Sequence, residues 1–188
     1  MQAMLVSTGV VALAEIGDKT QLLALVLAAR WRKPLPIILG ILVATILNHA
    51  LAGAVGAWLA AAIGPQAMRW ILGLSFLAMA VWMLVPDKAY DEAAAREPRQ
   101  GVFLATLVTF FLVEMGDKTQ VATVALAAKY AALWAVVAGT TLGMMLANVP
   151  AVLIGEGAAK TLPLGVVRAV AAFIFAMLGV LVLFGMGG

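Results

Sequence analysis

The sequence predicts an all-α integral membrane protein with six transmembrane helices, arranged as two inverted three-helix repeats. Its composition predicts the membrane class, because 65% of the 188 residues are hydrophobic and only 11% are charged, with a mean hydropathy of +1.10. A soluble protein of this size does not need so much apolar surface. The repeats are predicted by a segment near the N-terminus that recurs 99 positions later.

Six apolar runs have about the 20 residues that a helix needs to cross a bilayer. They are Met4–Ala28, Pro36–Ala57, Trp70–Val85, Val102–Ala128, Leu133–Ile154 and Val166–Phe184. The one long polar stretch, residues 86–100, separates the third run from the fourth. We therefore expect a first repeat over residues 1–85, a linker over 86–100 and a second repeat over 101–188. The first run has no cleavage-site pattern, so we interpret it as a span rather than a signal peptide.

The repeat is clearest around two charged segments. Leu13–Arg30 aligns with Leu112–Lys129 without a gap, and ten of the eighteen positions are identical. The same offset pairs Gly40 with Gly139 and Phe76 with Phe175, so it extends across three spans. Because three is an odd number, the second copy enters the membrane from the opposite side, which predicts inverted repeats.

The distribution of Lys and Arg outside these segments predicts the orientation. One side of the membrane receives eight of them: Arg30, Arg32, Lys33, Lys88, Arg96, Arg99, Lys160 and Arg168. The other side receives only Arg69 and Lys129. By the positive-inside rule the eight-residue side, with the linker, is cytoplasmic and both termini are outside. Since the basic residues are spread over loops between spans, we expect no nucleic-acid partner.

The first and fourth spans contain the same charged hexapeptide, Glu15–Thr20 and Glu114–Thr119, followed by Gln21 and Gln120 respectively. On a continuous helix, the Glu, Asp and Gln side chains of each motif would lie on one face, because they are three residues apart. This pattern predicts a ladder of oxygen ligands. Each charge at the middle of a bilayer costs about 2.5–3.5 kcal/mol on insertion scales, so such residues indicate function.

Charge counting points to cation transport. The carboxylates of Glu15, Asp18, Glu114 and Asp117, with the ammonium groups of Lys19 and Lys118, carry a formal charge of −2. One divalent cation or two protons would neutralise it, which is the balance of a cation/proton exchanger. The chain has no Cys, which favours hard cations such as Mn²⁺, Ca²⁺ or Mg²⁺ bound by oxygen. Alternatively, each Lys forms a structural ion pair with the Glu four residues before it.

Other polar residues near the motifs are secondary candidates. Thr20 and Thr119 are either ligands or donors to a carbonyl one turn back. Gly17 and Gly116 permit either close helix packing or local unwinding of the helix. The second span contains Asn48 and His49, and the fifth contains Asn148 at the position equivalent to His49. We place all three in supporting positions around the acids, as we do Gln21, Gln120, Lys19 and Lys118.

Two intact ExGDKT motifs in a chain of six short spans resemble the family of small cation/proton antiporters that includes bacterial manganese exporters and Golgi manganese and calcium transporters. The resemblance implies export of Mn²⁺, or transport of Ca²⁺, in exchange for protons. It also implies that Glu15, Asp18, Glu114 and Asp117 form the metal and proton site. The transported ion would be a substrate, and no cofactor is expected. The short linker suggests a compact bacterial member in the inner membrane.

Three other classes of protein were compared with this interpretation. Asp18 and Asp117 could form the dyad of an intramembrane aspartyl protease, but the Lys after each Asp favours two ionised carboxylates over a shared proton. We therefore expect no enzyme. An exporter of a small organic solute such as an amino acid is the closest alternative, although no Arg lies in the middle of a span to bind a carboxylate. A scaffold protein would not need doubled acids.

Overall fold

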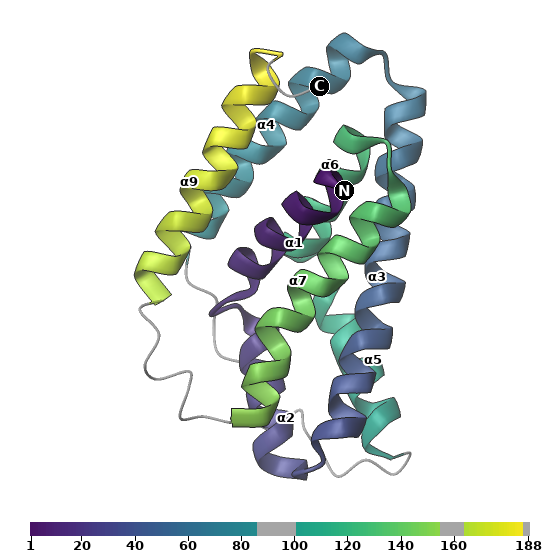
Figure 1. The fold of residues 1–188 in the computed structure, drawn as a ribbon, viewed down its shortest axis with the longest axis vertical. Coiled ribbons are helices and arrows are strands. Elements are labelled where there is room, and N and C mark those ends of the chain that lie inside the picture. The colour runs from purple at the N-terminus through teal and green to yellow at the C-terminus, as the bar shows by residue number, and fades with distance from the viewer. Residues whose placement is uncertain (86–100, 155–163, 186–188) are drawn as a thin grey trace.

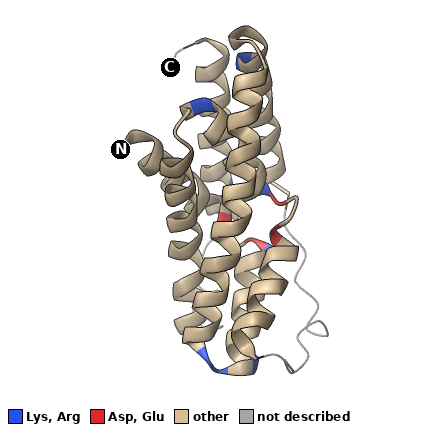
Figure 2. Cartoon of the chain, turned by 90° about the vertical axis from the view of Figure 1, so that its right-hand side faces the viewer, with Lys and Arg blue, Asp and Glu red and all other residues tan. Residues whose placement is uncertain are grey.

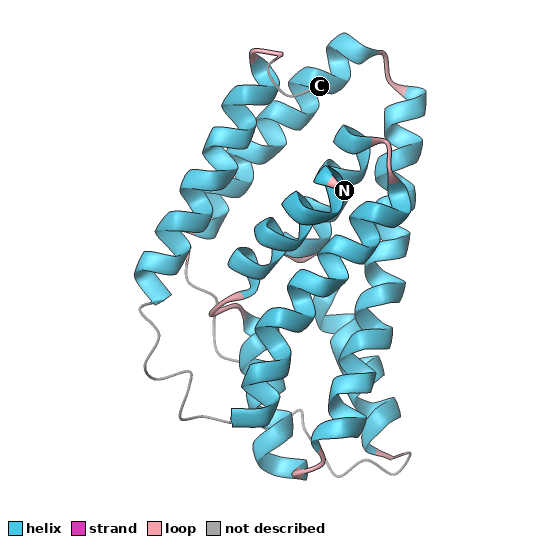
Figure 3. Ribbon diagram, in the orientation of Figure 1, coloured by secondary structure: helices cyan, strands magenta, loops and turns pink. Residues whose placement is uncertain are grey.

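The computed structural model describes residues 1–85, 101–154 and 164–185, and these residues form eight α-helices and no strand (Figures 1 and 3). The helices are α1 (Gln2–Glu15), α2 (Lys19–Trp31), α3 (Pro34–Ala62), α4 (Pro65–Met83), α5 (Val102–Glu114), α6 (Lys118–Tyr130), α7 (Leu133–Ile154) and α9 (Leu164–Leu183). The all-α prediction is thus confirmed for this part of the chain. The predicted linker 86–100, with Lys88, Arg96 and Arg99, lies outside the described residues, as does Lys160.

Four helices are long and apolar enough to cross a membrane: α3, α4, α7 and residues Gly165–Leu183 of α9. They correspond to the second, third, fifth and sixth predicted spans. Pro34 and Pro65 begin α3 and α4, where the fixed φ and missing amide hydrogen of proline suit the first helical turn. The sequence therefore located these elements to within a few residues.

The first and fourth predicted spans are each broken into two shorter helices. Over Met4–Ala28 and Val102–Ala128 the predicted spans are therefore not continuous helices. Gly17 has φ 78° and Gly116 has φ 76°, a left-handed conformation that stops a helix and that side chains other than glycine adopt only at a cost. Each charged motif therefore lies in a break between two helices. Of the two roles considered for these glycines, close helix packing and local unwinding, the structure shows local unwinding.

Small residues let the broken helices pack closely against the long ones. Helix α1 packs on α7, and α5 packs on α3. A Cβ atom added to Gly139 would lie 2.9 Å from Cβ of Ser7, and one added to Gly40 would lie 2.7 Å from Cβ of Thr106. Both distances are below normal van der Waals contact, so only glycine fits there. Residues that the offset of 99 made equivalent thus have equivalent packing roles.

The buried apolar residues form two clusters, one on each side of the helix breaks. The first joins α1, α4, α6 and α9, and contains the Phe76 and Phe175 rings, whose centroids are 6.2 Å apart. The second joins α2, α3 and α5 with Val152 of α7. Because α1 and α6 belong to one cluster and α2 and α5 to the other, the motifs lie between the two cores. Figure 2 shows their acidic residues midway along the bundle.

Candidate cation site

The two helix breaks have the same backbone conformation. Asp18 has φ −79° and ψ 166°, and Asp117 has φ −81° and ψ 167°. The amide of Asp18 donates to the carbonyl of Glu15 at 2.9 Å, and the amide of Asp117 donates to the carbonyl of Glu114 at 3.1 Å. Each Asp is the N-cap residue of the following helix, but its side chain makes no capping hydrogen bond. Both carboxylates are therefore available for contacts across the site.

The glutamines stabilise the breaks instead of extending a row of ligands. The Gly17 amide donates to Oε1 of Gln21 at 2.8 Å, and the Gly116 amide donates to Oε1 of Gln120 at 2.7 Å. Nε2 of Gln21 donates to the carbonyl of Ala147 on α7 at 3.0 Å. The predicted ladder on one helix face is therefore wrong, because the helix ends before the Asp and the Gln oxygen already accepts a hydrogen bond.

The threonines orient the glutamates of their own motifs. The Thr20 hydroxyl donates to Oε1 of Glu15, and the Thr119 hydroxyl donates to Oε1 of Glu114. A bond from either hydroxyl to a carbonyl one turn back is not found in the described part of the chain, and a ligand role for the two threonines stays a prediction. Each hydroxyl instead reaches back across the break, so one oxygen of each glutamate is held in a defined direction.

Two ion pairs connect the motifs to each other. Nζ of Lys19 lies 2.9 Å from Oδ1 of Asp117, and Nζ of Lys118 lies 3.4 Å from Oδ1 of Asp18. The alternative pairing of each Lys with the Glu four residues earlier is therefore wrong, because the break ends the helix that this spacing requires. Sequence spacing missed these cross-motif pairs, and the duplication itself was the signal that the two identical segments could meet.

All four carboxylates are buried at the two helix breaks, and the cross-motif ion pairs of Asp18 and Asp117 connect the breaks to each other. The exposed fraction is 0% for Glu15 and 2% for each of the other three acids. The structure thus brings together acids that are about a hundred positions apart in the sequence.

Several buried oxygens at this site have no hydrogen-bond donor within the described ranges. They are Oε2 of Glu15, Oε2 of Glu114, Oδ2 of Asp117, and the amide oxygens of Asn48 and Asn148. An ionised carboxylate only accepts hydrogen bonds, and leaving such an oxygen buried without a partner is costly. A bound cation or a proton would relieve that cost. The donor set consists of oxygen, which fits hard divalent cations.

The supporting polar residues differ in their distance from the acids. Nδ2 of Asn148 donates to Oε1 of Glu15 at 3.0 Å, so Asn148 contacts the site directly. Nδ2 of Asn48 donates to the carbonyl of Phe111 on α5 at 3.0 Å. His49 is fully buried, and its ring nitrogens have no hydrogen-bond partner in the described part of the chain.

Four helix ends also meet at the motifs. The C-termini of α1 and α5 carry a partial negative charge, and the N-termini of α2 and α6 carry a partial positive charge. Broken helices of this kind provide ion sites in transporters, because the unwound backbone and the helix ends contribute to binding. Among residues 1–85, 101–154 and 164–185, no group of three or more His, Cys, Asp or Glu side chains is arranged to hold a metal ion. The metal-binding roles of the four acids stay predictions.

Comparison with known proteins identifies the family. The model of the divalent cation/proton antiporter GDT1 family matches residues 3–91 and 102–187, which are most of the chain. The chain belongs to this family. A GDT1 relative from Vibrio cholerae serotype O1, named "Putative manganese exporter", is 51% identical over 179 residues, which are 95% of this chain and 88% of the relative. No solved structure gives a significant match.

Membership of the GDT1 family confirms the resemblance seen in the sequence. The protein is a multi-pass membrane transporter and not an enzyme, and the divalent cation is its substrate rather than a cofactor. Both family matches include an ExGDKT motif. The helix breaks therefore lie within the part of the chain that defines the family.

Proposed function

We propose that this GDT1 protein exports Mn²⁺ from the cytoplasm in exchange for protons, and that Glu15, Asp18, Glu114 and Asp117 form one shared site. The observation that carries this proposal is the group of buried oxygens without donors on Glu15, Glu114 and Asp117. A cation or protons would satisfy the same oxygens, so the two ligands exclude each other, as an antiporter requires. The name of the Vibrio cholerae relative favours Mn²⁺, while Ca²⁺ is the alternative cargo.

The two lysines act as internal counter-ions in this mechanism. Each Asp carboxylate is paired with the Lys of the other motif. An incoming divalent cation must displace these ammonium groups, which limits how tightly the cation binds. Proton binding to the acids would in turn release the cation. The site therefore exchanges its ligands without ever holding four uncompensated negative charges.

Alternating access around this site is supported by the unequal packing of the outer helices. Helices α4 and α9 pack on each other, and they make their other main contacts with α6 and α1 respectively. In an inverted repeat, a second conformation would exchange these contacts for ones with α2 and α5. In this conformation α4 and α9 thus cover the side of α1 and α6, and we propose that the other conformation covers the side of α2 and α5 instead.

The orientation follows from the basic residues. Arg30, Arg32 and Lys33 lie at the turn between α2 and α3, so the positive-inside rule places that end in the cytoplasm of a bacterial inner membrane. Reporter fusions at Ala93 should then report cytoplasm, and fusions at Gly188 should report the outside. Equal signals at both positions would contradict the inverted topology.

The decisive experiment is transport by purified protein in liposomes under an imposed pH gradient. Proton-driven flux should be found for Mn²⁺ or Ca²⁺, and it should fall as the side that supplies the metal is acidified, because protons compete for the same carboxylates. Flux of amino acids under the same conditions would favour the organic-solute alternative. The structure has a pocket of 790 Å³ among the ends of α3, α4, α6 and α9, and because no residue of either motif lines it, this pocket does not favour that alternative.

A further inference from the structure

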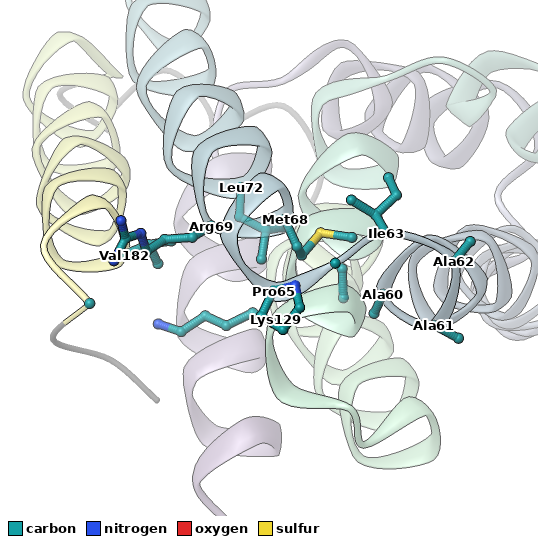
Figure 4. A pocket seen from close by; sticks show the side chains of 13 residues that line it. Ala60, Ala61, Ala62, Ile63, Pro65, Met68, Arg69, Leu72, Lys129 and Val182 are labelled. Atoms are coloured by element: carbon teal, nitrogen blue, oxygen red, sulfur yellow. The ribbon is translucent and has the colours of Figure 1, made fainter.

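A pocket at one end of the bundle combines two basic side chains with apolar walls. Its volume is 790 Å³, and it is lined by the end of α3, the start of α4 and the last turns of α6 and α9. Arg69 comes from α4 and Lys129 from α6. Figure 4 shows both side chains extending toward the same side of the pocket. Met68, Leu72 and Val182 are among the apolar residues that line it.

The two cations lack acidic partners within the described ranges. No Asp or Glu lines the pocket, and neither Arg69 nor Lys129 forms an ion pair there. Nε of Arg69 is buried and has no hydrogen-bond partner among the described residues. Nζ of Lys129 lies 5.2 Å from the centre of the Tyr130 ring. A buried guanidinium nitrogen without an acceptor is costly, so an anion is the expected partner.

Helix ends alone do not neutralise these charges. The C-termini of α3, α6 and α9 line the pocket with partial negative charge, and the N-terminus of α4 lines it with partial positive charge. Each helix end amounts to about half an elementary charge, so the two full charges of Arg69 and Lys129 leave the pocket positive.

The position of the pocket identifies the source of the anion. Three tryptophans with large exposed fractions lie at the same end of the bundle: Trp58 at 66%, Trp70 at 50% and Trp134 at 74%. Exposed Trp residues collect at the level of lipid headgroups. A free anion would gain nothing from the apolar walls, whereas the glycerol and upper acyl carbons of a lipid would contact them.

We propose that this pocket binds the phosphate group of a membrane phospholipid between Arg69 and Lys129. Arginine and lysine are the usual partners of phosphate, and the planar guanidinium can bind it with two parallel hydrogen bonds. Because Arg69 is on α4 and Lys129 is on α6, the bound lipid holds these two helices together. It thereby stabilises the arrangement in which α4 packs on α6.

The test measures the melting temperature of the delipidated full-length protein in detergent. Phosphatidylglycerol at about 100 times its Kd should raise the Tm by about 5–10 °C. Diacylglycerol, which lacks the phosphate, should not raise it, and inorganic phosphate with glycerol phosphate should have little effect. A rise of equal size with inorganic phosphate would overturn the lipid assignment in favour of a free-anion site. The absence of any rise with phosphatidylglycerol would overturn the proposal altogether.

Variants of Arg69 and Lys129 test whether the Tm rise with phosphatidylglycerol comes from lipid bound in the pocket. Arg69→Gln and Lys129→Gln should each raise, by about fivefold, the phosphatidylglycerol concentration that gives half of the full Tm rise. Each variant removes one basic side chain near the headgroup. Arg168→Gln is the matched control, since Arg168 occupies the equivalent position in the second repeat and does not line the pocket. Equal losses in all three variants would show a general charge effect and contradict the site.

A second variant covers the case in which Arg69→Gln does not fold. Arg69→Lys keeps a positive charge but removes the buried Nε–H donor, so it should still bind phosphatidylglycerol more weakly than the wild type. Native mass spectrometry of the same samples counts the bound lipids. At a phosphatidylglycerol concentration near the wild-type Kd, the wild type and Arg168→Gln should carry one bound phospholipid in about half of the molecules, and Lys129→Gln in about a sixth. Equal occupancy in Lys129→Gln and the wild type would overturn the proposal.

Discussion

The first and second ExGDKT motifs have the same local structure but different surroundings. Both breaks place glycine at a positive φ, and both use the same Gln-to-glycine and Thr-to-glutamate hydrogen bonds. Yet the side chain of Lys118 is only 3% exposed, whereas that of Lys19 is 29% exposed. Gly17 is buried, and Gly116 is exposed. The hexapeptide thus specifies its own conformation, and the neighbouring helices decide how accessible each copy is.

The unequal exposure has a structural cause. Helices α4 and α9 cover α1 and α6, so the apolar core on that side contains residues of all four helices. Among the described residues, the core formed by α2, α3 and α5 with Val152 of α7 has no contribution from α4 or α9. A symmetric pair of motifs inside an asymmetric shell is what one conformation of an alternating-access transporter requires. The proposals about the site therefore depend on two points. The two motifs must contribute equally to cation binding, and they must differ in their exposure to water.

The largest expected effect tests equality in chemistry. Asp18→Asn and Asp117→Asn should each reduce proton-driven Mn²⁺ flux in liposomes to background, because either change removes a charge from one shared site and breaks an ion pair with the lysine of the other motif. The control Asp91→Asn, which removes a carboxylate outside both motifs, should transport normally. Full activity in either motif variant would show that the two copies work independently.

A second prediction concerns the lysines. Lys118→Met should tighten Mn²⁺ binding roughly tenfold, about 1.4 kcal/mol, because it removes a competing cation from a buried carboxylate. Lys19→Met should have a smaller effect, since Lys19 is partly exposed and solvent weakens its ion pair with Asp117. Calorimetric titration with Mn²⁺ measures both affinities.

Lys118→Arg and Lys19→Arg, which keep the charge, are the controls for this prediction. Affinity that does not change in either Met variant would show that the two ion pairs are structural and do not compete with the cation.

A third prediction separates backbone strain from function. Gly116→Ala and Gly101→Ala both replace a glycine with positive φ and with open space around its Cβ position. Each should lose about 1–2 kcal/mol of stability and melt a few degrees lower in a thermal unfolding assay. Only Gly116→Ala should also lower Mn²⁺ flux several-fold, because only this residue lies in a motif. Similar flux losses in both variants would show that flux falls because the protein is less stable, and not because the conformation of the motif has changed.

The smallest expected effect tests inequality in access. The chain has no cysteine, so single cysteines introduced at equivalent positions can be compared directly. Met115 is 56% exposed, whereas Ile16 is only partly exposed. Met115→Cys should therefore react about twice as fast as Ile16→Cys with a water-soluble maleimide, and a proton gradient should change the ratio. Equal reaction rates of the two cysteines under all conditions would show that the unequal exposure of the two motifs has no part in transport.

Much of this protein could be predicted from the sequence because the physical signals are local. Apolar runs of spanning length located α3, α4, α7 and α9, since burying so much apolar surface in a bilayer needs no information from distant residues. The offset of 99 identified equivalent residues such as Gly40 and Gly139, and their packing roles agree in the structure. The doubled acids pointed to a cation transporter because charge inside a membrane has few other uses.

Only the tertiary structure decided how the site residues are arranged. Helical spacing made a Lys19–Glu15 ion pair the alternative to a cation site, but a glycine at positive φ stops the helix between them, and Lys19 pairs with Asp117 of the other motif instead. Such a contact depends on two segments about a hundred residues apart meeting in space, and no local pattern encodes that. The same holds for Asn148, which reaches Glu15 only because α7 packs on α1. The sequence by itself therefore identified the candidate site residues, and packing between the two halves of the chain decided which of them touch.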